Sequence, residues 1–89
     1  MTLKLEGRLA GPVVEELRRT WSSLSTSIGE RDLQIDLRNV MFADYRGIAL
    51  LAEICYRTGA RFQADTPLLK YFAEEAIRKS RNLLSHKGA

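Results

Sequence analysis

The sequence predicts a single small α/β domain with a mostly parallel sheet of three or four strands and three or four helices. The chain contains two kinds of segment that follow one another. In the short ones apolar and polar residues alternate, and in the longer ones apolar residues recur every three or four positions. Glycine or proline stands at most boundaries between these segments. The resulting order of strand, helix, strand, helix, strand, helix is typical of a parallel sheet with right-handed crossovers.

The first strand and the first helix are predicted at residues 3–9 and from Pro12 onward. Leucines alternate with charged residues over the strand, so one of its faces should be in water. Gly11 ends the strand, and Pro12 suits the first turn of a helix. The helix carries one apolar stripe with spacings of three and four residues, formed by Val14, Leu17, Trp21, Leu24 and Ile28.

The second strand is predicted at residues 33–40 and the second helix at residues 46–58. A turn at residues 29–32 leads into the strand, which has Leu33, Ile35 and Leu37 on one face and Gln34, Asp36 and Arg38 on the other. The helix is apolar on most of its surface, so it should be the most buried of the helices. Gly59 is expected to end it as a C′ glycine.

A short third strand at residues 61–64 precedes a last helix with Pro67 in its first turn. Six residues of this helix are expected to face inward: Leu68, Leu69, Phe72, Ala73, Ala76 and Ile77. The domain should span residues 1–80, with a basic and flexible C-terminal tail at residues 81–89. The predicted core contains Leu17, Trp21, Leu24, Ile35, Leu37, Leu51, Ile54, Phe72 and Ile77.

Composition and charge indicate a soluble cytoplasmic protein. Hydrophobic residues make up 45% of the chain and charged residues 28%, as in ordinary globular proteins. No apolar run approaches the roughly 20 residues that a membrane span needs, so no membrane insertion is expected. The net charge of +3 comes from residues 78–89, which hold four basic residues and no acid. The rest of the chain has no nucleic-acid signature, and we favour a solvated helix end over an RNA or lipid contact for the basic segment.

The residues that catalysis would need are absent or poorly placed, so we expect no enzyme, no metal and no cofactor. His86 stands alone, and Cys55 lies among apolar residues in the middle of a helix, where packing is its expected role. Neither of the glycine-rich loops that cradle phosphates is present. Asp36 and Asp44 could be imagined as a Mg²⁺ pair, but a mid-strand aspartate on a polar face is more often solvated or paired with an arginine.

The candidate site is the corner at residues 42–47, which reads FADYRG and joins the second strand to the second helix. In open α/β sheets, ligands and partners bind at the carboxyl ends of the strands. Asp44 is either a binding residue or the N-cap of the helix, and Tyr45 is expected to be an exposed aromatic contact. Arg46 either binds a partner or points into water or pairs with Asp44 or Glu53. Gly47 either allows a close approach or is a tolerated first-turn residue.

These motifs resemble the STAS domain, a family that includes anti-sigma factor antagonists, domains of sulphate transporters and small subunits of lipid-trafficking ABC transporters. The resemblance is carried by LEGRLAGPVVEELRRTW, by IDLRNVMFAD followed two residues later by Gly47, and by ADTPLLKYFAEEA. It covers residues 3–77. It implies that Asp44 and Gly47 match the family's aspartate and glycine, and that Arg46 stands where phosphorylatable members have serine or threonine.

The sequence departs from the family in two respects. Arg46 cannot accept a phosphate, so we expect no serine or threonine kinase to switch this corner and the partner to bind constitutively. Family members also have a further strand before the one predicted at residues 3–9. The edge that this strand would cover is expected to be exposed or filled by another chain, which predicts a weak homodimer.

The leading hypothesis is a non-enzymatic protein-interaction module. It would bind an anti-sigma factor, a kinase-like protein or a transport partner through Phe42, Asp44, Tyr45, Arg46, Gly47 and the nearby Thr66. The first alternative is an accessory subunit docked to the ATPase of a lipid-type ABC transporter. The second alternative is a nucleotide-binding domain.

Overall fold

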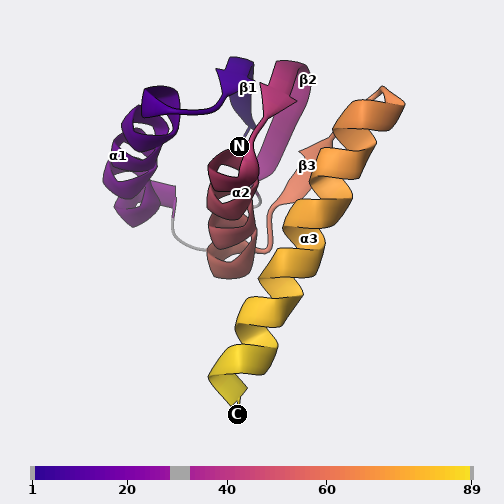
Figure 1. Ribbon diagram of the computed structural model, residues 1–89. Coiled ribbons are helices and arrows are strands. Elements are labelled where there is room, and N and C mark those ends of the chain that lie inside the picture. The colour runs from indigo at the N-terminus through magenta and orange to yellow at the C-terminus, as the bar shows by residue number, and fades with distance from the viewer. Residues whose placement is uncertain (1, 29–32, 89) are drawn as a thin grey trace.

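The computed structural model describes the backbone of residues 2–28 and 33–88 and the side chains of residues 2–23 and 33–83. In this part of the chain, strands β1 (Thr2–Leu9), β2 (Gln34–Ala43) and β3 (Arg61–Gln63) alternate with helices α1 (Pro12–Ile28), α2 (Tyr45–Thr58) and α3 (Pro67–Gly88) (Figure 1). All three strands are parallel and form one sheet in the order β1-β2-β3. The predicted small α/β domain is therefore confirmed.

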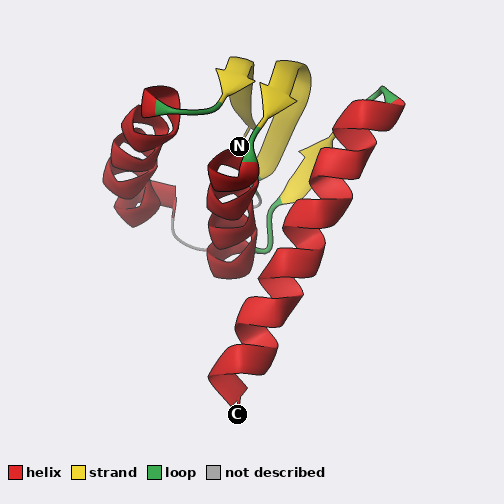
Figure 2. Ribbon diagram, viewed as in Figure 1, coloured by secondary structure: helices red, strands yellow, loops and turns green. Residues whose placement is uncertain are grey.

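The three helices stand side by side on one face of the sheet, with α2 between α1 and α3 (Figure 2). A strand order that follows the sequence places the two crossover helices α1 and α2 on the same side, because both crossovers are right-handed and run in one direction. Helix α3 follows the last strand and joins this layer by packing against α2. The other face of the sheet carries polar residues that remain exposed, among them Lys4, Glu6, Arg8 and Arg38. Strand β1 lies at one edge of the sheet and β3 at the other.

The core lies between the sheet and the helix layer. Ile35 and Leu37 of β2 and Leu50, Leu51 and Ile54 of α2 are fully buried. Five residues of the predicted core are buried as expected alongside Trp21, namely Ile35, Leu37, Leu51, Ile54 and Phe72, while Leu17 is partly buried against them. The side chains of Leu24 and Ile28 and the turn at residues 29–32 lie outside the described residues.

Two residues of α3 do not face inward, contrary to the prediction. Leu68 is 50% exposed and Ile77 is 36% exposed. The buried stripe of this helix is narrower than predicted, because α3 packs mainly against α2 through one face. That face consists of Leu69, Phe72, Ala73, Ala76 and Ser80.

Strand β2 is longer than predicted, because it carries two extra residues opposite β1. The register of the two strands shifts between Lys4 and Glu6 and again between Gly7 and Arg8. Each shift inserts one residue into β2 and changes which side chains point inward. The buried apolar residues of the strand are consequently spaced by two, three and three positions, at Ile35, Leu37, Val40 and Ala43. The strand thereby ends beside Leu9, directly before Asp44.

Glycine and proline mark the helix boundaries at the positions that the sequence predicts. Gly59 adopts a left-handed conformation, φ 68°, and its N–H donates to the Cys55 carbonyl at 2.7 Å. Pro67 is the first residue of α3, as predicted. Helix α3 continues through residues 81–88, the segment that the sequence assigned to a tail. No helix in the described part of the chain is long and apolar enough to cross a bilayer.

Candidate functional site

Asp44 ties the start of α2 to the turn between β1 and α1. Its Oδ1 accepts from the Gly47 N–H at 2.8 Å, and its Oδ2 accepts from the Gly11 N–H at 3.4 Å. The Asp44 N–H in turn donates to the Leu9 carbonyl at 3.1 Å. The first of these bonds is an N-cap, so the capping role considered for Asp44 is confirmed. The other two connect segments more than thirty residues apart in the sequence, as the 33-residue separation of Gly11 and Asp44 shows.

Gly47 is buried beneath the corner, against the backbone of Leu9. A Cβ atom at this position would collide with the Leu9 carbonyl oxygen. The glycine is therefore required by the close approach of β1 to the first turn of α2. Together with Asp44, it fixes the backbone from which the two intervening side chains project.

Tyr45 and Arg46 both project into solvent from this fixed backbone. Tyr45 is 74% exposed, and the ammonium group of Lys79 from α3 lies 4.5 Å from its ring centroid. Arg46 is exposed and forms no ion pair with any described residue. Glu53, one of the partners considered for it, instead pairs with Arg18 at 2.6 Å and with Arg57 at 3.7 Å.

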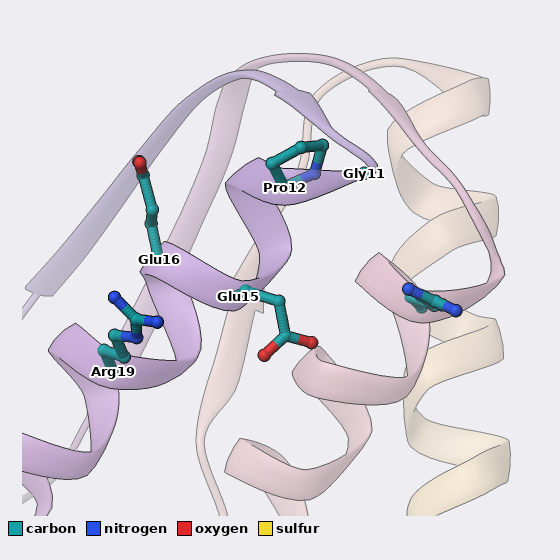
Figure 3. Close-up of a pocket in the computed structure, with 6 residues that line it drawn as sticks. Gly11, Pro12, Glu15, Glu16 and Arg19 are labelled. Atoms are coloured by element: carbon teal, nitrogen blue, oxygen red, sulfur yellow. The ribbon is translucent and has the colours of Figure 1, made fainter.

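Arg46 lines an open depression of about 500 Å³ at the starts of α1 and α2. The other lining residues are Gly11, Pro12, Glu15, Glu16 and Arg19. Figure 3 shows the Glu15 carboxylate between the two helices, whereas Glu16 and Arg19 project from other sides of α1. Because the first turn of a helix disfavours a cation, Arg46 has no local source of stabilisation from the helix dipole.

Phe42 links the corner to α3. Its ring makes an edge-to-face contact with Phe72, with 6.3 Å between centroids, and the Arg8 guanidinium lies 5.3 Å from its centroid on the open side of the sheet. Tyr71 is exposed and lies 5.9 Å from Phe72. Lys79 is a neighbour of the corner that nothing local in the sequence indicates, because only the packing of α3 on α2 brings it beside Tyr45.

Thr66 directly precedes α3, and this helix starts at the same end of the sheet as the corner (Figure 2). Its hydroxyl accepts from the Leu69 N–H at 3.2 Å, and its carbonyl accepts from the Lys70 N–H at 2.9 Å. No hydrogen bond within the described residues joins it to the corner. The structure thus brings Phe42 and residues 44–47 together and leaves Thr66 on a separate helix start.

Asp36 is buried, with 2% exposure, rather than solvated on the polar face. Arg38 covers it with three bonds of 3.0 Å, two from the guanidinium and one from the backbone N–H. These hydrogen bonds lower the pKa of Asp36 to about 2 and raise the pKa of Arg38. Pairing with an arginine was one of the two expectations for Asp36, and its carboxylate is fully occupied by this pairing.

The remaining sequence candidates are Cys55 and His86. Cys55 is only half-buried, and its Sγ lies 3.7 Å from the Ala60 carbonyl oxygen. Among the described residues, no three His, Cys, Asp or Glu side chains gather in a way that could hold a metal ion. The side chain of His86 lies outside the described residues.

Comparisons with models of known protein families, with curated proteins and with solved structures found no match for this chain. The resemblance to the STAS family therefore rests on the sequence motifs alone.

Proposed function

We propose that this chain is a non-enzymatic protein-interaction module of STAS type that binds its partner through residues 42–47. The observation that carries the proposal is the exposure of Tyr45, at 74%, next to an exposed Arg46 that pairs with no acid among the described residues, on a backbone fixed by Asp44. Tyrosine and arginine are enriched among the residues that dominate binding energy in protein interfaces. A fixed backbone also lowers the entropy lost when these side chains become ordered against a partner.

Arg46 defines the chemistry of the partner surface. It is a permanent cation without an ion-pair partner among the described residues, so an acidic group on the partner would complete the site. Since Arg46 occupies the position where phosphorylatable relatives have a hydroxyl, binding would be constitutive. Any regulation would then act on the partner or on the amount of either protein.

Site-specific photo-crosslinking in the native cell tests this proposal. A photo-reactive phenylalanine analogue would replace Tyr45 in one variant and Arg61 in the control. Arg61 is also exposed, but it lies at the start of β3 and therefore at the opposite end of the sheet. We expect a discrete crosslinked partner from position 45 and none from position 61, and we expect Arg46→Glu to abolish the product.

The captured protein distinguishes the two kinds of partner. An anti-sigma factor or kinase-like protein would support the regulatory role, and a transporter ATPase would support the accessory-subunit role. Equal crosslinking from both positions, or none from position 45, would contradict a binding role for the corner. Saturable binding of ATP or GTP to the isolated chain, measured by calorimetry, would instead support the nucleotide-binding alternative.

A further inference from the structure

A groove runs along the outer side of α2, away from the sheet. It consists of two adjoining depressions of about 260 and 370 Å³ that share Ala49 of α2 and Leu83 of α3. Tyr45 and Lys79 lie at one end of the groove, and Tyr56 and Arg57 lie at the other. Helix α2 lies between α1 and α3, which supply Arg18 on one side of the groove and Lys79 and Leu83 on the other (Figure 1).

The groove has an apolar floor of the length of a short helix. Tyr45 and Tyr56 are eleven positions apart on α2, which corresponds to about 16 Å along the helix axis, or three turns. Between them, Leu83 is 43% exposed and projects from α3. An exposed leucine between two tyrosines can bury apolar surface against a partner.

The rim of the groove carries a surplus of positive charge. Arg18, Arg57 and Lys79 line it, and the only acid among the lining residues is Glu53, which already bonds both arginines. Along the adjoining α3, the sequence from residue 76 to the C-terminus contains four basic residues and no acid. The groove is therefore complementary to an acidic ligand.

We infer that this groove docks an acidic amphipathic helix of about three turns, of the helix-in-groove kind. A second copy of the chain is a poor occupant, because a two-fold axis would place the same basic rim against itself. The phosphates of a nucleic acid could pair with the basic residues of the rim, but they would leave Leu83 and the tyrosines without apolar partners. The inference deepens the proposed function and rests on it, since Tyr45 belongs to both surfaces and the helix would come from the same partner.

A designed peptide tests the occupant directly. The probe is a labelled helical peptide of 18 residues with leucines along one face and glutamates beside them, and its control has lysines in place of the glutamates. Fluorescence anisotropy gives the affinity, and amide NMR shifts of the full chain locate the site. We expect the acidic peptide alone to bind, with shifts at Ala49, Ala52, Tyr56 and Leu83.

Matched variants distinguish binding in the groove from non-specific electrostatic or hydrophobic binding elsewhere on the surface. Leu83→Glu and Lys79→Glu should each weaken binding about tenfold, the size of a moderate interface contribution. Leu68→Glu and Lys70→Glu make the same changes at exposed positions of α3 that do not line the groove, and they should leave the affinity unchanged. Circular dichroism checks that all four variants fold.

The inference fails if the acidic peptide does not bind, if the basic peptide binds equally well, or if Leu83→Glu has no effect. Tighter binding of a single-stranded RNA or of anionic vesicles at these residues would also overturn it. These outcomes are distinct from a failure of the proposed function. Crosslinking at Tyr45 without peptide binding would reject only the helix as occupant, and peptide binding without any crosslink would reject only the corner.

Discussion

Helices α2 and α3 begin with the same local chemistry but in different surroundings. In each, a side-chain oxygen accepts from the N–H three residues later, from Gly47 to Asp44 and from Leu69 to Thr66. Asp44 also bonds Gly11, and its N–H bonds Leu9, so the start of α2 is fastened to β1. At the start of α3, in contrast, residues 65–68 are all exposed.

The difference shows how exposed side chains can be held in place. The capping bond alone orders a helix turn, and both helices have it. At the start of α2, the long-range bonds of Asp44 and the burial of Gly47 add attachments to β1 and to the turn that follows it. Tyr45 and Arg46 therefore project from a rigid base, which is the property that a binding site needs.

The largest effect on stability should come from Gly47→Ala. Alanine favours a helix by about 1 kcal/mol over glycine. The added Cβ would nevertheless collide with a backbone oxygen that no side-chain rotation can move. We expect a net loss of about 3 kcal/mol in the free energy of unfolding, at the upper end of overpacking effects. Urea denaturation measures it, and an unchanged or increased stability would show that β1 and α2 are not in this close contact.

Asp44→Ala should have the next largest effect, about 2 kcal/mol, because it removes an N-cap and a tertiary hydrogen bond together. Asp44→Asn retains an oxygen acceptor for the Gly47 N–H and should recover part of the loss. The same urea denaturation compares the two variants. If Asp44→Ala lowers the free energy of unfolding by no more than the loss of an exposed N-cap such as Thr66, the starts of α2 and α3 are held equally firmly.

Thr66→Ala should cost about 1 kcal/mol or less, since only a local cap is lost at an exposed helix start. Thr66→Ser keeps the hydroxyl and is the matched control, with nearly unchanged stability expected. Thermal unfolding of the three proteins gives the comparison. A loss equal to that of Asp44→Ala would mean that the start of α3 is as firmly held as the corner.

Tyr45→Ala should change stability least, by no more than about 0.5 kcal/mol, because an exposed ring and one exposed cation–π contact are lost. Partner crosslinking from a neighbouring position should nevertheless fall. A large destabilisation without an effect on the partner would identify Tyr45 as a structural residue.

The order and type of the elements were predictable because they depend on local properties of the chain. These are the spacing of apolar residues and the glycine and proline residues at element boundaries. The helix starts at Pro12 and Pro67 and the helix end at Gly59 followed directly from residue chemistry. Asp44 was recognised as a candidate cap for the same reason. Its bonds to the β1–α1 turn could not be predicted, because they depend on which strands become neighbours.

The errors have a common physical origin in tertiary packing. The alternation in β2 assumed a regular strand, whereas two insertions opposite β1 change the inward face after Leu37. Leu68 and Ile77 fit an apolar helix face, but α2 covers only the stripe between them. The weak homodimer through β1 stays a prediction.

The affinity of the crosslinked partner for wild type, Arg46→Ser and Arg46→Glu tests the central claim most directly. Calorimetry measures it, and circular dichroism confirms the fold of each variant. If the corner is the binding surface, Arg46→Glu should weaken binding by about 2 to 5 kcal/mol, since a lost interfacial charge pair becomes a like-charge contact. Arg46→Ser should fall between Arg46→Glu and wild type. Equal affinities for all three proteins would contradict the claim that residues 42–47 bind the partner through Arg46.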